Sequence, residues 1–239
     1  MDLLPNDLSR ANRTQLLISK GVSGIVREPC TTAKWMRSTS YDIQAVLANL
    51  ALCPALRFVD LKHARITDVA PLTALTNLQH LDLHNTLVTD VTPWVALTCL
   101  MYLDLSNTPV MDVTPLTALT NLEYLDLHDT LVTDVTPLTA LTSLKDLDMS
   151  GMYSITNFEP LTALTSLKRL NLNCTRFADV TPLVALTGLL YLDIGFTRVA
   201  DVIPLVVLTN LQYLKLYRSR VTDVTPLAVL TNLQLSLAF

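Results

Sequence analysis

The stretch Leu122–Ser143, LEYLDLHDTLVTDVTPLTALTS, recurs along the chain with its leucines and its proline in the same places. Counted from its first leucine, the unit has Leu at positions 1, 4 and 6, Thr at 9, Val at 11, Asp at 13, Pro at 16 and Leu at 17 and 20. The copies begin at Leu56, Leu78, Leu100, Leu122, Leu144, Leu167, Leu189, Leu211 and Leu233. The step is 22 residues every time except for one step of 23, so the chain is an array of one short structural unit.

The alternation within LEYLDL predicts the secondary structure of the unit. Leucines alternate with polar residues, which is the pattern of a half-buried strand. A unit this short cannot hold a full crossover helix, so each strand must pair in parallel with the next through a compact turn. The Asp-Val-Thr-Pro segment supplies that turn, because Asp accepts a backbone N–H at its start and Pro needs no donor there. We therefore predict an α/β solenoid with a concave parallel sheet and short helical or 3-10 turns on the convex side.

The chain divides into two regions at about residue 55. Residues 56–239 hold about eight full units and an irregular terminal unit, whereas residues 1–55 do not repeat. The first open turn of a solenoid must be covered, so residues 1–55 are predicted to form an N-terminal cap. The segment 41–50 has apolar residues at helical spacing, which predicts a helix within this cap.

The last unit departs from the pattern. The run Leu233-Gln234-Leu235-Ser236-Leu237 is one residue shorter than the corresponding run from Leu211. Losing one residue inside a strand exchanges its two faces, so the strand register is expected to fail here. Two outcomes are open. Leu235, Leu237 and Phe239 could form a lid, or the end could stay open and mediate an end-to-end homodimer.

These repeats resemble those of leucine-rich repeat proteins, in the short class of bacterial internalins and of phosphatase-regulatory proteins. The likeness covers about residues 52–237, and the phrases D-V-T-P-L and L-T-N-L are especially similar to internalin repeats. Threonine at position 9, together with the 23-residue unit, also resembles the repeats of kinetoplastid leucine-rich repeat proteins. The family usually has Asn at position 9, where it bonds backbone groups of adjacent turns. A threonine hydroxyl is expected to do part of that bonding.

Charge is distributed unevenly along the chain. The net charge is −4 and the pI is near 5.5, which gives no general attraction to nucleic acid. Residues 66–144 hold nine acidic side chains and no Lys or Arg. A partner steered by charge to this zone would present a basic surface. The alternative is that these carboxylates only keep a leucine-rich protein soluble.

The residues between the strand leucines point out of the predicted concave sheet and form its contact surface. Position 3 is mostly aromatic and position 5 mostly acidic. Aromatic area beside unpaired charge favours protein binding. The predicted partner-binding residues are His80, Asp82, His84, Tyr102, Asp104, Tyr124, Asp126, His128, Tyr191, Asp193 and Tyr213.

Metal binding and catalysis are both poorly supported. His80, Asp82 and His84 share one strand face, but side chains two apart in a strand start almost 7 Å from each other, which is wide for metal ligands. A regular ladder of carboxylates offers no pocket that excludes water or separates two pKa values. We therefore expect no metal, no cofactor and no enzymatic activity. The basic group Lys215, Tyr217, Arg218 and Arg220 could hold phosphate or an acidic peptide, or be a solvated rim.

The four cysteines have no metal-ligand spacing. The first residues lack the pattern of a secretory signal, so a cytoplasmic location is expected unless a leader precedes them. Prolines and charges interrupt every apolar run, so no membrane span is expected. The predicted function is a non-enzymatic scaffold that binds another protein on its concave face. The alternatives are an internalin-like secreted or injected virulence factor and a regulatory subunit of an enzyme such as a phosphatase.

Overall fold

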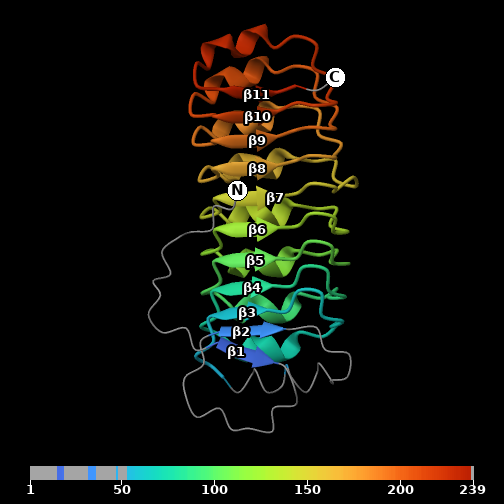
Figure 1. The fold of residues 1–239 in the computed structure, drawn as a ribbon, viewed down its shortest axis with the longest axis vertical. Helices are drawn as coiled ribbons and strands as arrows, with labels where there is room; N and C mark the ends of the chain where they lie inside the picture. The colour runs from blue at the N-terminus through green and yellow to red at the C-terminus, as the bar shows by residue number, and fades with distance from the viewer. Residues whose placement is uncertain (1–14, 19–31, 36–46, 48–52, 238–239) are drawn as a thin grey trace.

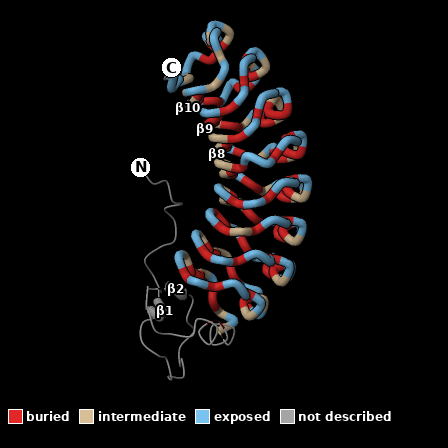
Figure 2. The backbone as a smooth tube through the Cα atoms, turned by 90° about the vertical axis from the view of Figure 1, so that its right-hand side faces the viewer, coloured by how far each residue is buried: buried red, intermediate tan, exposed pale blue. Residues whose placement is uncertain are grey.

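The computed structural model of the chain describes residues 15–18, 32–35, 47 and 53–237. Eleven strands form one parallel sheet in which the spatial order is the chain order, β1 to β11 (Figure 1). Seen from the side, the described chain is an arc with the strands on its inner face and the helical turns on its outer face (Figure 2). The predicted solenoid, with its concave parallel sheet and convex 3-10 turns, is therefore confirmed.

Each complete unit contributes one strand and one 3-10 turn. The strands are β1 Gln15–Ile18, β2 Thr32–Trp35, β3 Phe58–Asp60, β4 His80–Asp82, β5 Tyr102–Asp104, β6 Tyr124–Asp126, β7 Asp146–Asp148, β8 Arg169–Asn171, β9 Tyr191–Asp193, β10 Tyr213–Lys215 and β11 Gln234–Ser236. The turns are η1 Ala70–Ala74, η2 Thr92–Ala96, η3 Thr114–Ala118, η4 Thr136–Ala140, η5 Glu159–Ala163, η6 Thr181–Ala185, η7 Ile203–Val207 and η8 Thr225–Val229.

The repeated leucines and valines form one continuous core. In the unit of β6, Leu122, Leu125 and Leu127 on the strand side and Leu138 and Leu141 on the turn side are all fully buried. Equivalent residues of the neighbouring units join them in a single cluster (Figure 2). A lone unit would leave half of this apolar surface in water, so each unit depends on its neighbours for burial.

The repeated aspartate of position 13 caps the convex turn as predicted. Oδ1 of Asp112 accepts the backbone N–H of Thr114 at 2.8 Å, and the next unit repeats the bond between Asp134 and Thr136 at 2.8 Å. In the 23-residue unit Asn157 takes over, accepting the N–H of Glu159 at 3.0 Å. The bond therefore requires a side-chain oxygen and not a charge.

The threonines of position 9 do not connect adjacent turns, so that prediction is wrong. The hydroxyl of Thr130 donates to the carbonyl of Leu127 at 2.8 Å, within its own unit, and Thr197 does the same with Ile194 at 2.7 Å. Threonine is too short to reach the next turn, and Thr108, Thr130, Thr175 and Thr197 bond within their own loops instead, whereas the buried hydroxyl of Thr86 has no partner among the described residues.

Exposed asparagines make side-chain bonds from one turn to the backbone of the preceding turn. Nδ2 of Asn121 donates to the carbonyl of Thr98 in the preceding unit at 2.9 Å. Asn77 and Asn210 form equivalent bonds, to Pro54 at 3.0 Å and to Thr187 at 2.8 Å. The asparagine of the L-T-N-L phrase thus links turns from outside the core.

The last unit keeps its register, contrary to expectation. Leu235 of β11 pairs with Leu214 of β10, so it stays on the inward face. In the preceding unit two successive amides, of Gln212 and Tyr213, donate to the carbonyl of Leu190, whereas only Gln234 donates to Gln212. The missing residue is absorbed before the strand begins, where it costs one hydrogen bond and does not exchange the faces.

The division of the chain at residue 55 remains a prediction. The predicted helical segment 41–50 lies outside the described residues except for Leu47, which is fully buried against the core. β1 and β2 belong to residues 1–55 and continue the sheet, because β2 pairs in parallel with β3. Among the described residues, no helix is long and apolar enough to cross a membrane.

Replacing Asp112 with Ala removes one turn cap and is expected to lower the melting temperature by about 2–4 °C. Asp112→Asn retains an acceptor oxygen, as Asn157 does naturally, and is expected to melt close to the wild type. Thermal unfolding followed by circular dichroism checks both variants. Equal losses in the two variants would show that the charge, not the acceptor, stabilises the turn.

Candidate protein-binding face

Three rows of side chains run along the concave face, and the strand register aligns them as predicted. Position 3, the aromatic row, consists of Phe58, His80, Tyr102, Tyr124, Asp146, Arg169, Tyr191 and Tyr213. Position 5, the acidic row, consists of Asp60, Asp82, Asp104, Asp126, Asp148, Asn171, Asp193 and Lys215. Position 7, the third row, includes His84, Ser106 and His128 in the units of β4 to β6. The structure thus brings the predicted residues together on one surface.

Four rings of the aromatic row form one stack. The ring centroids of Phe58 and His80 lie 4.1 Å apart, those of His80 and Tyr102 3.9 Å, and those of Tyr102 and Tyr124 4.2 Å. The planes of these pairs are 5–14° apart. Because each ring is held between neighbours, its conformational freedom is already restricted before any partner binds.

The stack ends at Asp146, so the predicted tyrosines fall into two groups. Arg169 pairs with Asp146, with Nε and Oδ2 3.1 Å apart, and its guanidinium lies 4.4 Å from the ring centroid of Tyr191. Tyr213 is half-exposed at the next strand. Tyr191, beside Arg169, and Tyr213 are therefore separate from the stacked rings of Tyr102 and Tyr124.

Every aspartate of the acidic row also has a structural role. Oδ1 of Asp82, Asp104 and Asp126 accepts the backbone N–H two residues further on, at 3.0, 2.9 and 2.8 Å. Asn171 makes the same bond to Asn173 at 3.0 Å. Since an amide suffices in that unit, the fold needs an acceptor at position 5 but not a negative charge.

The acidic row is neutralised at its two ends and not in its middle. Lys62 lies 3.6 Å from carboxylate oxygens of both Asp60 and Asp82, and Lys215 lies 3.4 Å from Asp193. Asp104, Asp126 and Asp148 form no ion pair with any Lys or Arg in the described part of the chain. The middle of the face therefore holds three carboxyl groups that no Lys or Arg of the described residues pairs with.

The crowding of these carboxylates shifts their titration. Burial, together with the charges of Asp148 and Asp104, raises the pKa of Asp126 to about 8. Burial is also the main cause that raises the pKa of Asp82 above its usual range. In the aromatic row burial lowers the pKa of His80 to about 4, so this ring is neutral at physiological pH within the stack.

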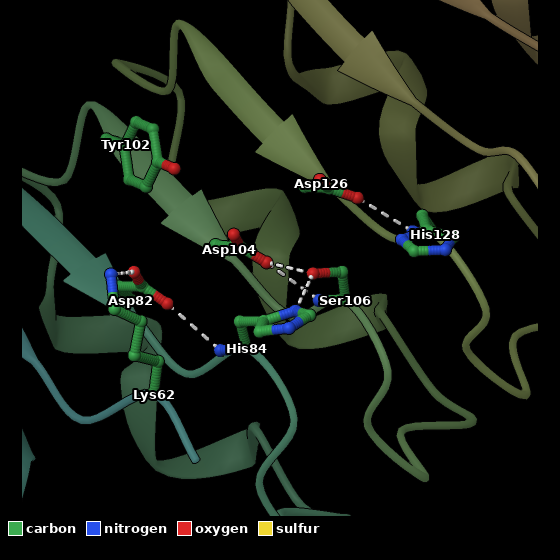
Figure 3. Close-up of a pocket in the computed structure, with 8 residues that line it drawn as sticks. All are labelled: Lys62, Asp82, His84, Tyr102, Asp104, Ser106, Asp126 and His128. Carbon is green, nitrogen blue, oxygen red and sulfur yellow. Dashed lines mark hydrogen bonds and ion pairs between the residues drawn. The ribbon is translucent and has the colours of Figure 1, made fainter.

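The middle of the face is slightly hollowed. A shallow open depression of about 400 Å³ is lined by Lys62, Asp82, His84, Tyr102, Asp104, Ser106, Asp126 and His128 (Figure 3). These residues come from four successive units and include six of the predicted binding residues. The depression is where the aromatic, acidic and third rows are all accessible together.

A serine and a histidine meet in this depression, but their arrangement does not suit nucleophilic catalysis. Nδ1 of His84 lies 2.7 Å from Oγ of Ser106, which itself donates to Oδ1 of Asp104 at 2.5 Å (Figure 3). The serine proton is thus directed to the carboxylate and not to the imidazole. Ser106 is also only 2% exposed, so a substrate could not reach its oxygen.

The structure offers no metal site in its described part. No group of three or more His, Cys, Asp or Glu among those residues is placed to hold a metal ion. His128 is occupied by Asp129, with Nε2 and Oδ2 3.0 Å apart.

Comparisons with known proteins agree with this geometry. The family model for leucine-rich repeats matches residues 54–96, 100–140 and 120–163. The solved structure of internalin C2 from Listeria monocytogenes is 36% identical with a TM-score of 0.69, and the alignment covers 73% of this chain and 77% of that one. A second internalin of the same organism is 28% identical with a TM-score of 0.67, over 78% of this chain and 62% of that one.

A leucine-rich repeat protein of Leptospira interrogans shares the fold at 20% identity, with a TM-score of 0.66, over 87% of this chain and 58% of that one. No curated protein sequence matches the chain significantly. The chain is a repeat protein with an open parallel sheet and a preformed concave surface. It belongs to the leucine-rich repeat family, and its repeats resemble those of internalins.

Sequence reasoning found the rows but not their internal bonding. The ring stack was not foreseen, although adjacent aromatic residues at one repeat position were its signal. The structural bonds of the acidic row were missed as well. Their signal was Asn171, the one position-5 residue that keeps an acceptor oxygen and loses the charge.

Replacing Asp126 with Asn tests the crowding of the acidic row. Because the pKa of Asp126 is raised to about 8, the folded state keeps a proton that the unfolded state loses near pH 4. The contribution of this proton to the free energy of unfolding is therefore complete below pH ~4 and is lost as the pH rises towards 8. Asp126→Asn keeps the acceptor oxygen and does not titrate, so it avoids this loss. We expect its free energy of unfolding, relative to the wild type, to be about 1–3 kcal/mol higher at pH 8 than at pH ~5.

Urea unfolding at both pH values measures this gain. Asp112→Asn is the matched control, because hydrogen bonds from Thr114 lower the pKa of Asp112 and it is ionised in both states at both pH values. Its effect on stability should not differ between the two conditions. Equal effects of Asp126→Asn at the two pH values would contradict the raised pKa.

Proposed function

We propose that this protein is a non-enzymatic scaffold that binds another protein along its concave face, and that the partner surface is basic. The observation that carries the proposal is the stack of four rings beside three aspartates, Asp104, Asp126 and Asp148, that pair with no Lys or Arg of the described residues. Such a surface joins aromatic contact area to an unmatched charge, the two features that favour a protein partner.

The rigidity of the face supports tight binding. The rings of Tyr102 and Tyr124 are already stacked, and the carboxylates are already oriented by backbone N–H groups. A partner therefore has little ordering entropy to overcome when it binds. Tyr102 and Tyr124 act as anchors in this proposal, and Asp104 and Asp126 receive Lys or Arg side chains.

The negative charge of the acidic row indicates that the partner's surface is positively charged. The fold requires an acceptor oxygen at position 5 but not a charge, since Asn171 meets the same structural need. Burial, together with repulsion from neighbouring carboxylates, nonetheless disfavours the charged form of Asp126 and raises its pKa. A basic partner neutralises these carboxylates and relieves their repulsion. Binding at this surface therefore also stabilises the folded protein.

A second candidate is an internalin-like factor that acts on a host protein outside the producing cell. Its support is the 36% identity with internalin C2 over most of both chains. It shares the concave-face mechanism and differs in location. Fractionation of the native source decides between it and a scaffold that acts inside the producing cell.

Changing Tyr102 and Tyr124 together to Ala tests the concave face. The partner is first isolated by affinity purification and mass spectrometry from the native source, and its affinity is then measured by calorimetry. We expect the double variant to bind at least about 30-fold more weakly, because buried aromatic anchors contribute about 1 kcal/mol or more each.

Tyr153→Ala is the matched control, because Tyr153 is well exposed but lies outside the three rows. It should leave the affinity unchanged. A further variant, Asp104→Lys, should weaken binding and reduce its dependence on salt. Unchanged affinity in the double tyrosine variant, with its fold intact by circular dichroism, would rule out the concave face as the binding surface.

The end-to-end homodimer through the C-terminal unit remains a prediction. Leu235 and Leu237 are 38% and 39% exposed. If they mediate a dimer, Leu235→Asp with Leu237→Asp should convert it to a monomer in light scattering. A wild-type mass that stays monomeric at high concentration would exclude this dimer.

A further inference from the structure

Basic and aromatic side chains gather at one edge of the solenoid, on the loops that follow the strands of the last three complete units. We define the rim patch as Arg176, Phe196, Arg198, Arg218 and Arg220. It lies beside the concave face and not within its three rows. Its charge is opposite to that of the acidic row, so the proposed function does not account for it.

Three arginines of the rim patch form a ladder at position 10. The backbone fixes their stacking, because the N–H of Arg198 donates to the carbonyl of Phe177 and that of Arg220 to Val199, both at 2.8 Å. Adjacent parallel strands are about 4.8 Å apart, so Arg176 and Arg220 are roughly 10 Å apart along the edge.

The arginine ladder is not required by the fold. The same position is occupied by Leu87 and Leu131 in earlier units, whose N–H groups make the same backbone bond, by Pro109, and by Arg65 alone in the first unit. Arg176, Arg198 and Arg220 are all exposed. None of the three forms an ion pair with another described residue. Three like charges are thus held side by side without compensation within that part of the chain.

Phe196 is a second, independent departure from what the fold prefers. It lies at position 8, where every unit turns through the left-handed region, and its φ is 52°. Earlier units place Asn85, Asn107 and Asp129 there, the residue types that tolerate this conformation. A bulky ring is costly in this region, and this ring is also 43% exposed.

The ring of Phe196 is held in place by its neighbours. It meets the ring of Tyr217 edge to face at 5.3 Å, and the guanidinium of Arg218 lies 5.3 Å from its centroid. Tyr217 is fixed in turn, because its hydroxyl accepts Nδ2 of Asn173 at 2.7 Å. A Cβ at Gly195 would lie 2.8 Å from the Tyr217 ring, so only glycine leaves room for this arrangement.

Other basic residues of these units are already engaged and do not join the patch. Lys215 pairs with Asp193, Arg169 with Asp146, and Lys168 donates to the carbonyl of Gly188. The basic group expected from the sequence near residue 215 therefore loses Lys215. It gains Arg176, Arg198 and the ring of Phe196.

We propose that the rim patch is a second docking site, which binds an acidic segment of another protein that also carries an aromatic or apolar side chain. The arginines receive its carboxylates, and Phe196 contacts its apolar side chain. Arginine and aromatic residues together are the residue types that contribute most to protein interfaces.

The flanking charges favour an acidic protein segment over nucleic acid. Asp179, Asp201 and Asp223 follow the three arginines by three residues each, and all are exposed. A phosphate backbone that extends beyond the ladder would approach these carboxylates and be repelled. A short acidic segment can contact the three arginines without approaching these carboxylates.

The test titrates the full chain into a fluorescein-labelled synthetic peptide that alternates Glu with Phe, at low salt, and follows fluorescence anisotropy. Arg198→Gln with Arg220→Gln should weaken binding at least about tenfold. Arg57→Gln with Arg65→Gln makes the same change of net charge at exposed arginines far from the patch. This matched control should change the affinity by less than about twofold.

Phe196→Asn separates docking from folding. Asn suits the left-handed position, so this variant should melt at or above the wild-type temperature. It should nevertheless bind the Glu–Phe peptide more weakly, and no more tightly than wild type binds a peptide with Ala in place of Phe. Unchanged affinity in Phe196→Asn would overturn the role of the ring.

Several other results would overturn the proposal. These are no binding of the peptide by the wild type, equal losses in the two arginine double variants, or equally tight binding of an oligonucleotide of the same charge. A dimer that Arg198→Gln with Arg220→Gln dissociates would assign the patch to a second copy of this chain. Because the concave tyrosines are unchanged in all these variants, failure here leaves the concave-face proposal standing.

Discussion

The structure depends on a burial requirement that no unit can meet alone. Each unit turns its leucines inward from a strand of three residues and a five-residue 3-10 turn, and these are covered only when a neighbour stacks on each side. Parallel pairing enforces this stacking, since every strand hydrogen-bonds to the strands before and after it. The 22-residue spacing then places equivalent residues of successive units beside one another.

Because the units stack, a residue type that recurs at one position of the unit forms a row of neighbouring side chains. One aromatic residue per unit becomes a ring stack, one aspartate becomes a line of carboxylates, and one arginine becomes a ladder. The concave face and the rim patch both arise in this way and have opposite charge. Each holds charges that the fold does not need, since Asn171 replaces an aspartate in the acidic row and Leu87 or Leu131 replaces an arginine on the rim.

Structural and binding roles are combined in the same side chains. Asp126 uses one oxygen to hold the N–H of His128 and is crowded by Asp104 and Asp148. Ser106, in the central depression, is likewise engaged in structural bonds. Its hydroxyl joins His84 to Asp104 and is not accessible as a nucleophile. Such bonding makes the face rigid, which suits recognition better than catalysis.

The sequence by itself determined the solenoid, the inward leucines, the aspartate caps and the residues that line the concave face, because all of these follow from a local period. Only the tertiary structure decided how neighbouring units use the same residues. It placed side-chain bonds between turns on the exposed asparagines before the strands and not on the position-9 threonines, and it absorbed the missing residue before β11. It also revealed which charges are paired and which remain free. These features depend on distances between side chains of different units, which a repeat pattern does not specify.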